Sequence, residues 1–337
     1  MFGLFDKNLS LPCDASQIRP CCFGKLPIHS DFIRYNLATR EAGAFEKWVQ
    51  EGAGCIARKH PKGWPPVYRH FPVHHFVLAG SEQEMNLIGS LVSSQDKSGR
   101  VYPFSTLAAV GGGMFHTNRA TLPLVCREFF RESQAFMGHA REAASVPALF
   151  QQLDELATAS PLYQQRELVE MQIRLLETVS LKKYWNGLQV PATEREQFWC
   201  AFYDIMKTVQ SRGPSRTNWG IRIPIPSEDD QTPYVVFWVQ MVEAILEDRF
   251  WRAHYFWNKK TGDSNASMTL FFRPLPPSYL LPLLNQVLDD NAIFDLGREW
   301  ISSPAFTSRV DLRRLLENDD IPMLEVLYRT GRREMLR

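Results

Sequence analysis

The chain has 337 residues, of which 45% are hydrophobic and 22% are charged, with 38 Lys and Arg against 37 Asp and Glu. This length exceeds that of one ordinary domain and predicts two, in a globular protein with ample material for a core. The balanced charge argues against an extended nucleic-acid footprint and against purely electrostatic attachment to a membrane.

Cysteine usage and the lack of long apolar stretches bear on the compartment. The six cysteines match no small disulfide scaffold, so we interpret them as reduced thiols. The N-terminal residues lack the basic and apolar regions of a signal peptide, and no stretch approaches the roughly 18 uninterrupted apolar residues of a transmembrane helix. We therefore expect a soluble cytoplasmic protein without direct membrane insertion.

The first half of the chain predicts a strand, a helix and three further strands after a mixed extension over residues 1–20. The first strand starts near Cys21 and ends at Pro27. A helix is expected over 41–59, and its apolar residues at helical spacing are Phe45, Trp48, Val49 and Ile56. The three strands that follow are expected at about 67–79, 86–94 and 101–110. The turn between the last two contains Gly99, which can take a positive φ.

Helices are expected after this sheet. The apolar stripe over 121–141 predicts one helix, capped by the Thr121 side chain. Two amphipathic segments begin at Ser145 and Ser160, and they read as a helical connector that continues to about residue 185.

The second half repeats the same order of elements. The Thr193-x-x-Glu196 spacing predicts a capping box at the start of a helix. Alternation over 221–225 indicates a strand, and its prolines favour an edge position. A helix is expected from Thr232. The remaining predicted elements are a hairpin with strands near 251–257 and 268–272, an apolar helix from about 276 to 288, and two short helices at the end.

This pattern predicts an α/β (α+β) fold in which antiparallel sheets are covered by helices, with one such sheet in each half. Large apolar residues alternate on both faces of the strand that ends at Trp257, so one face is expected to pack on another domain or on a partner. The predicted segments are an extension over 1–20, an α/β domain over 21–142, a helical connector over 143–190, and a smaller α/β domain with a helical tail over 191–337.

No catalytic or metal signature stands out. His70, His74 and His75 invite a zinc interpretation, but they fall on a predicted strand that places His75 opposite the other two, and further ligands are lacking. Neither Gly24-Lys25 nor the glycines at 111–113 belong to a Walker loop, and no serine sits in a nucleophile elbow. We expect no enzyme activity, no metal and no cofactor.

Two short blocks about seventy residues apart carry the most specific signal. The first is Phe23-Gly24-Lys25-Leu26-Pro27-Ile28-His29-Ser30-Asp31-Phe32-Ile33-Arg34, and the second runs from Asp96 to Phe104. With the tryptophan-containing helix between them, they resemble the type VI secretion-associated TagF family, also called ImpM, over roughly residues 20–140. The residues that carry the resemblance, and our candidates for partner binding, are Gly24, Lys25, Pro27, Asp31, Phe32, Arg34, Trp48, Asp96, Gly99, Arg100, Tyr102 and Pro103.

The resemblance implies an N-terminal domain of longin or profilin type. It also implies an accessory, non-enzymatic protein that restrains a bacterial type VI secretion system after translation. Family members are linked to a forkhead-associated-domain scaffold protein, which the resemblance makes the expected partner. Two alternatives stay open: a structural scaffold of the apparatus, and a small hydrolase or phosphatase-linked module.

The two blocks themselves allow two interpretations. In the structural one they preserve turn geometry and bury Phe32 and Phe104. In the functional one they form a single face that docks a partner. Asp31 is expected either to cap a turn through backbone N–H groups or to pair with Arg100.

Overall fold

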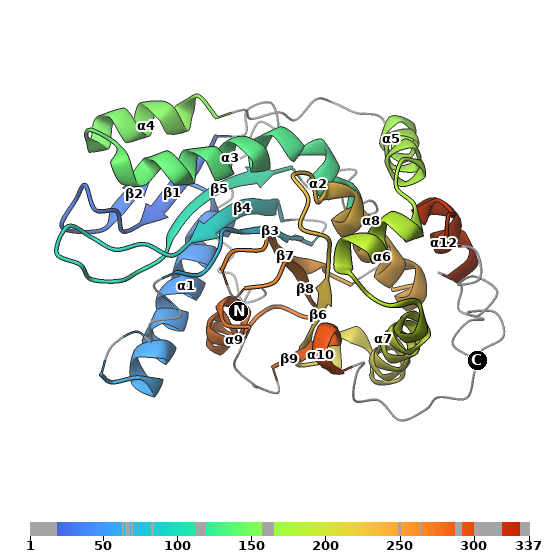
Figure 1. Cartoon of the computed structure of the whole chain (residues 1–337). Coiled ribbons are helices and arrows are strands. Elements are labelled where there is room, and N and C mark those ends of the chain that lie inside the picture. The colour runs from blue at the N-terminus through green and yellow to red at the C-terminus, as the bar shows by residue number, and fades with distance from the viewer. Residues whose placement is uncertain are drawn as a thin grey trace.

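Helices pack on both faces of one nine-stranded sheet in the computed structural model (Figure 1). The structure describes residues 19–62, 64, 68, 70–81, 84–111, 119–156, 165–248, 251–262, 264–286, 292–299 and 319–330. The predicted α/β class with largely antiparallel strands is confirmed. Within these residues, no helix combines the length and the apolar character that crossing a bilayer requires.

The strand order across the sheet is β2-β1-β5-β4-β3-β7-β8-β6-β9. All neighbouring strands are antiparallel except β6 and β9, which are parallel. The strands are β1 (Cys21–Gly24), β2 (Ile33–Tyr35), β3 (His74–Leu78), β4 (Asn86–Val92), β5 (Phe104–Val110), β6 (Gly220–Pro224), β7 (His254–Asn258), β8 (Ser267–Phe271) and β9 (Ile293–Asp295).

The pairing of β3 with β7 joins the two halves of the chain. Phe76 lies opposite Phe256 in this pair, and their ring centroids are 5.4 Å apart. The sequence predicts one sheet for each half, whereas the structure has a single sheet. Pairing satisfies the backbone groups along two edges that would otherwise be left open. The division into domains at 142 and 190 stays a prediction.

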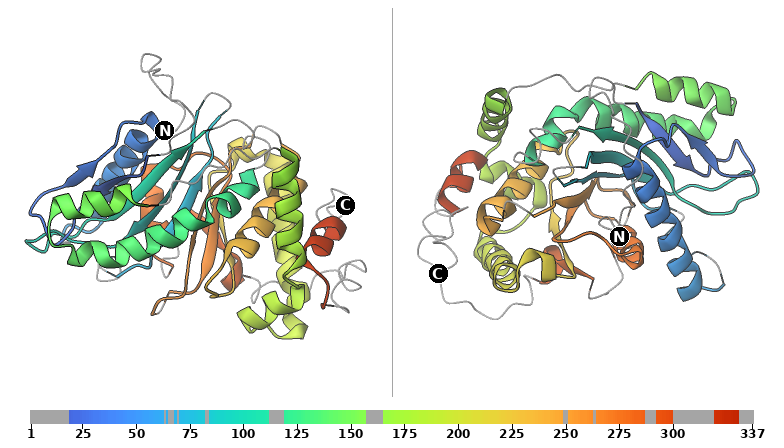
Figure 2. Two further views of the ribbon diagram at one scale, coloured as in Figure 1. Left: turned by 90° about the horizontal axis from the view of Figure 1, so that it is seen from above. Right: turned by 180° about the vertical axis from the view of Figure 1, so that it is seen from behind.

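One face of the sheet is covered by α1 (Arg40–Lys59), η6 (Pro277–Tyr279) and α9 (Leu280–Leu284). The Thr39 side chain caps α1 by accepting a hydrogen bond from the backbone N–H of Ala42 at 3.3 Å. Phe45 of α1 stacks on Phe76 of β3, with ring centroids 4.5 Å apart. Helix α1 therefore packs on the part of this face formed by β3, β4 and β5, and Figure 2 shows the helices and the sheet from two further sides.

The opposite face carries the larger set of helices, whose side chains form two apolar clusters with the sheet. They are η3 (Arg119–Thr121), α2 (Leu122–Val125), α3 (Arg127–His139), η4 (Ala140–Glu142), α4 (Val146–Asp154), α5 (Gln165–Glu177), α6 (Leu181–Leu188), α7 (Ala192–Arg212), α8 (Thr232–Leu246) and α12 (Met323–Thr330). The short elements η5 (Pro214–Arg216) and α10 (Leu296–Glu299) complete the described structure.

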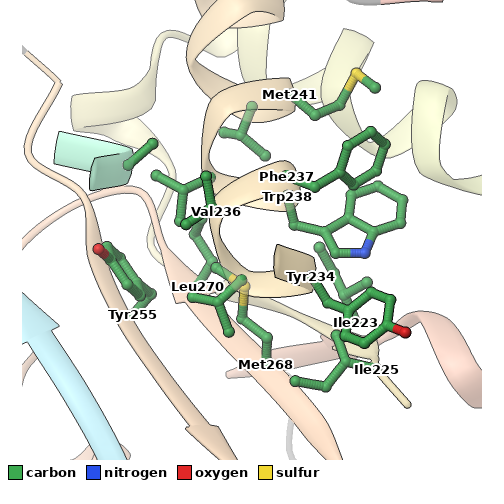
Figure 3. Packing of buried hydrophobic residues seen from close by; sticks show 14 of the residues in the cluster. Ile223, Ile225, Tyr234, Val236, Phe237, Trp238, Met241, Tyr255, Met268 and Leu270 are labelled. Atoms are coloured by element: carbon green, nitrogen blue, oxygen red, sulfur yellow. The ribbon is translucent and has the colours of Figure 1, made fainter. Parts of the chain in front are cut away.

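Helix α8 lies at the centre of the largest apolar cluster (Figure 3). It is apolar nearly all round, which is the pattern of a helix buried between two layers. On one side it meets sheet residues such as Tyr255 and Met268, and on the other it meets α5, α6, α7 and α12. Trp238 packs on Phe202 of α7 with ring centroids 4.9 Å apart.

The aromatic strand near Trp257 is buried on both faces inside this chain. Phe256 packs in the α1 cluster, and Trp257 packs against Phe130 of α3 on the other face. The two side chains are 1% and 5% exposed. This strand therefore presents no docking surface, because it occupies the middle of the common sheet. Phe250 lies outside the described residues.

Several predicted elements differ in detail. The helix expected over 121–141 is divided at Cys126 into α2 and α3, and the Thr121 side chain makes no capping hydrogen bond. Helix α7 begins at Ala192 after Pro191, so Thr193 lies inside the first turn instead of at the cap. The fixed φ of Pro191, −60°, suits the start of a helix and places that start earlier.

Two further differences concern the C-terminal half. Strand β6 is not an edge strand, because β9 pairs with it over Gly220–Arg222. Pro224 lies beyond that pairing, so its missing N–H costs no hydrogen bond to β9. The apolar helix expected from 276 to 288 is the shorter pair η6 and α9, and the residues from 287 to 291 lie outside the described structure.

Candidate functional site

The two motif blocks lie side by side, as the interpretation of a single shared face requires. Strand β1 of the first block pairs with β5 directly after the second, and Gly24 lies opposite Phe104. Gly24 has a φ of +132°, and a Cβ atom on it would lie 2.2 Å from the carbonyl oxygen of Pro103. Only glycine allows the two backbones to approach so closely.

A tight turn follows β1. The backbone N–H of His29 donates to the carbonyl of Leu26 at 3.1 Å, which places Pro27 at the second position of the turn. Proline suits that position because its ring fixes φ near the required value. The carbonyl of His29 in turn accepts from the backbone N–H of Lys97, at 2.9 Å. This bond ties the loop of the first block to the loop of the second.

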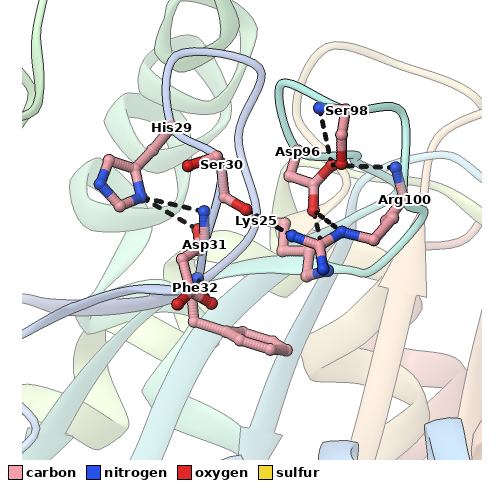
Figure 4. A network of polar contacts seen from close by, with 8 residues as sticks. All are labelled: Lys25, His29, Ser30, Asp31, Phe32, Asp96, Ser98 and Arg100. Atoms are coloured by element: carbon pink, nitrogen blue, oxygen red, sulfur yellow. Dashed lines mark hydrogen bonds and ion pairs between the residues drawn. The ribbon is translucent and has the colours of Figure 1, made fainter.

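Asp96 organises the loop of the second block (Figure 4). Its Oδ1 accepts hydrogen bonds from the backbone N–H of Ser98 at 2.9 Å, from the Ser98 hydroxyl at 2.7 Å and from the backbone N–H of Arg100 at 3.0 Å. Gly99 has a φ of +83°, which lets its N–H reach the carbonyl of Asp96 at 2.9 Å. The loop is therefore fixed by its own aspartate.

The second oxygen of Asp96 binds two cations. Lys25 Nζ lies 2.9 Å from Oδ2, and Arg100 Nε lies 2.7 Å from the same atom. The Asp96 side chain is fully buried, that of Lys25 is 9% exposed, and that of Arg100 is 62% exposed. Burial alone would raise the pKa of Asp96. The hydrogen bonds from Ser98, Lys25 and Arg100 outweigh burial and hold the pKa well below its ordinary value.

Asp31 does not pair with Arg100. Its Oδ1 accepts a hydrogen bond from the backbone N–H of the next residue, Phe32, at 2.7 Å, which fixes the local backbone and does not close a turn. Arg100 pairs with Asp96 instead and donates from its second nitrogen to the carbonyl of Ser30. Asp31 itself is exposed.

Arg34 binds helix α1. Its guanidinium lies 2.7 Å from Glu46 Oε2, with the Arg34 side chain 60% exposed and that of Glu46 10% exposed. The hydrogen bond with Glu46 raises the pKa of Arg34 above its ordinary value. Both arginines of the motif blocks thus present an exposed guanidinium that is held by a largely buried carboxylate.

Phe32 is exposed, whereas Phe104 is buried. The structural interpretation of the blocks expects both rings in the core, but Phe32 is 45% exposed and Phe104 is 0% exposed. Strand alternation explains the difference, because the next residue, Ile33, turns inward toward α3 and α4. The Phe32 ring packs edge-on against Tyr102 at 4.8 Å, and Lys25 Nζ lies 4.9 Å from its centroid.

The remaining candidates lie inside the fold. Tyr102 and Pro103 are buried beside β5. Trp48 is 3% exposed and packs on Phe45 in the α1 cluster, with ring centroids 5.5 Å apart. Because these three residues are buried, they do not form part of the exposed surface.

His74 and His75 lie on opposite faces of β3, as the sequence predicts, whereas His70 precedes this strand, which begins at His74 and not at residue 67, and is exposed. His74 Nδ1 contacts the carbonyl of Pro72 at 2.9 Å, and His75 on the other face contacts the Ser90 hydroxyl at 2.8 Å. Burial lowers the pKa of both from 6.5 to about 4, so both are neutral at pH 7. Among the described residues, no three His, Cys, Asp or Glu side chains form a group that could hold a metal ion.

The geometry defines an α/β protein in which two motif blocks pair at one corner of a large sheet and expose an aromatic ring and two guanidinium groups. Residues 21–156 match the model of the TagF N-terminal domain, described as type VI secretion system-associated. This match associates the chain with type VI secretion through the domain at residues 21–156.

Other comparisons add no functional information. The chain is similar in structure to the protein PA0076 from Pseudomonas aeruginosa PAO1, with a TM-score of 0.48 and 12% sequence identity over 86% of this chain and 99% of that chain. Curated protein sequences give no match.

Proposed function

We propose that this type VI secretion-associated protein is a cytoplasmic, non-enzymatic regulator that represses secretion after translation by binding another component of the apparatus. The match of residues 21–156 to the TagF N-terminal domain carries the proposal. The family resemblance of the two motif blocks points to a forkhead-associated-domain scaffold protein as the bound component.

The arrangement of charges in the corner supports binding as the mode of action. Asp96 and Lys25 are buried and bonded to one another, so they serve to hold the two loops together. The groups that face solvent include the Phe32 ring and the guanidinium groups of Arg34 and Arg100, together with Asp31 and Lys97. Aromatic and arginine side chains are the groups that dominate binding energy at protein interfaces.

The test compares three arginine variants in the native cell. Arg34→Ala and Arg100→Ala change the corner, and Arg174→Ala, on α5 with a 79% exposed side chain, is the matched control. The three guanidinium groups are exposed, but Arg34 and Arg100 pair with largely buried carboxylates, so we expect a modest loss of stability in the two corner variants and little in the control, and thermal melts check that all three fold. We expect the two corner variants to release secretion and to retain less scaffold protein on co-purification, while the control behaves as the parent chain does.

Different results would contradict different parts of the proposal. Unchanged secretion after removal of the whole protein would refute repression. Folded corner variants that repress normally would place the docking face elsewhere. Unfolding of both corner variants in thermal melts would show that the arginines serve the fold.

A further inference from the structure

The corner of the sheet formed by the two motif blocks, residues 23–34 and 96–104, exposes a small group of neighbouring side chains. Among the described residues, the exposed large hydrophobic side chains are Phe32, Val169 and Tyr328. Only Phe32 belongs to the motif blocks. Arg34 stands two residues after it, and Arg100 donates to the carbonyl of Ser30, two residues before it, so both arginines belong to the same loop region as the ring. We call Phe32, Arg34 and Arg100 the Phe32 surface.

The Phe32 ring is held in place before any partner arrives. The backbone N–H of Phe32 is bonded to Asp31, and the ring contacts the buried side chains of Tyr102 and Lys25. The loop on which it stands is tied to the second block through Lys97 and His29. Because a fixed side chain has little conformational entropy left to lose, covering it retains most of the favourable free energy of burial.

In this corner the negative charges are mostly buried and the positive charges are mostly exposed. The carboxylates that bind the arginines are buried or nearly so, with side-chain exposures of 0% for Asp96 and 10% for Glu46. The guanidinium groups are about six-tenths exposed, and Lys97 beside them is also exposed. Asp31 is the exposed carboxylate of this corner. Asp96 also pairs with Lys25, so its single negative charge is shared between two cations and neutralises Arg100 only in part.

We propose that the Phe32 surface docks into an apolar pocket on an acidic protein, with carboxylates of that protein bound to Arg34 and Arg100. This inference rests on the proposed function and defines the chemistry of the partner at the same site. Guanidinium groups bind carboxylates through paired hydrogen bonds, and the central aromatic ring needs a pocket that excludes water. Nucleic acid fits less well, because binding to it draws on many phosphate contacts, whereas the whole chain has a net charge of +1.

Photo-crosslinking in the native cell tests the proposal with the full chain. A benzophenone amino acid replaces Phe32, and in a control chain it replaces Tyr328, which is 58% exposed on the distant helix α12. The crosslinked peptide is identified by mass spectrometry. We expect position 32, and not position 328, to crosslink to a protein segment in which Asp or Glu flanks apolar residues.

Charge reversal then tests the pairing. Arg34→Glu with Arg100→Glu should reduce crosslinking at position 32 at least about thirtyfold, the loss expected when an interface hot spot is removed. Replacing the mapped carboxylates of the partner by Lys should restore it. Thermal melts of the reversed chain confirm that it folds, and Arg34→Gln with Arg100→Gln replaces it if it does not.

Each opposing outcome overturns the inference. An acidic protein partner would be refuted by crosslinks to nucleic acid or lipid, or to a protein segment without carboxylates. It would also be refuted if the crosslinking yield stayed equal after charge reversal or neutralisation, or if no crosslink formed. Failure of the proposed function is seen separately, because secretion would then be unchanged when the whole protein is removed.

Discussion

Replacing Gly24 by alanine tests whether the close approach of the two blocks determines their geometry. The new Cβ atom would lie 2.2 Å from the carbonyl oxygen of Pro103 and 2.7 Å from the Cα atom of Phe104. Comfortable contacts between such atoms start at about 3.5 Å, so the two backbones must separate by roughly 1 Å. Both neighbouring atoms belong to the backbone and cannot rotate away.

The cost can be estimated from what separation disrupts. Gly24 pairs with Phe104 at the end of the β1–β5 ladder, so one or two backbone hydrogen bonds weaken, at about 1 kcal/mol each. The φ of +132° adds about 1–3 kcal/mol for any residue with a side chain. We expect a loss of about 2–5 kcal/mol in the free energy of unfolding, which lowers the melting temperature by roughly 3–7 °C in a chain of this size.

Gly99→Ala is the matched control. Gly99 also has a positive φ, +83°, but its Cβ would have nothing within 4 Å. Only the backbone penalty applies, about 1–2 kcal/mol. Thermal melts and urea unfolding of both variants measure the difference. Equal losses of stability for the two variants would refute the reasoning, because steric contact with Pro103 would then contribute nothing.

Three further predictions concern buried groups. Lys25→Met removes a cation from the buried Asp96 carboxylate and should lower the urea midpoint of unfolding. Lys97→Met changes an exposed lysine in the loop of Asp96 and should leave the midpoint unchanged. Equal effects of the two variants would contradict a special role for the buried pair. Burial lowers the pKa of His74 and His75 from 6.5 to about 4, so the unfolded chain binds more protons between these values and stability should fall as the pH falls through this window. His75→Gln should make that decline shallower in urea unfolding at successive pH values, and an unchanged slope would contradict the assignment. Elemental analysis of the purified chain should find no stoichiometric zinc, and one tightly held zinc per chain that is lost on changing His70 and His74 would reverse this expectation.

Local patterns predict the elements of this fold well, but not how the two halves join. The alternation near Tyr255 and the turn residues behind it predict the β7–β8 hairpin, because its partners are close in sequence. The β3–β7 pair joins residues about 180 positions apart, such as Val77 and Tyr255. Both strands are buried on both faces. Their sequences therefore show no alternation of apolar and polar residues that would tell the middle of one large sheet from a smaller sheet.

In the candidate site, too, local features were predictable from the sequence and long-range contacts were not. The blocks and their proximity were predictable, yet Asp96 and not Asp31 proves to be the partner of Arg100. The Asp-x-Ser-Gly sequence at Asp96 is a recognisable turn pattern in which the aspartate binds backbone N–H groups ahead of it. Its bond to Lys25, 71 residues away, carries no sequence signal of its own. Phe32 was a candidate for partner binding, but the structural interpretation placed its ring in the core because phenylalanine is usually buried. The inward direction of Ile33 shows why the neighbouring Phe32 ring is exposed.

The β3–β7 pair also determines how fragments of this protein would behave. A piece cut after residue 156, where the matched domain ends, would carry β3 with one hydrogen-bonding edge uncovered, and Phe76 would lose its contact with Phe256. An uncovered edge with apolar side chains is a template for pairing with other strands, including those of a second copy. Such a fragment would self-associate and capture unrelated proteins, so recognition is a property to be measured on the intact chain.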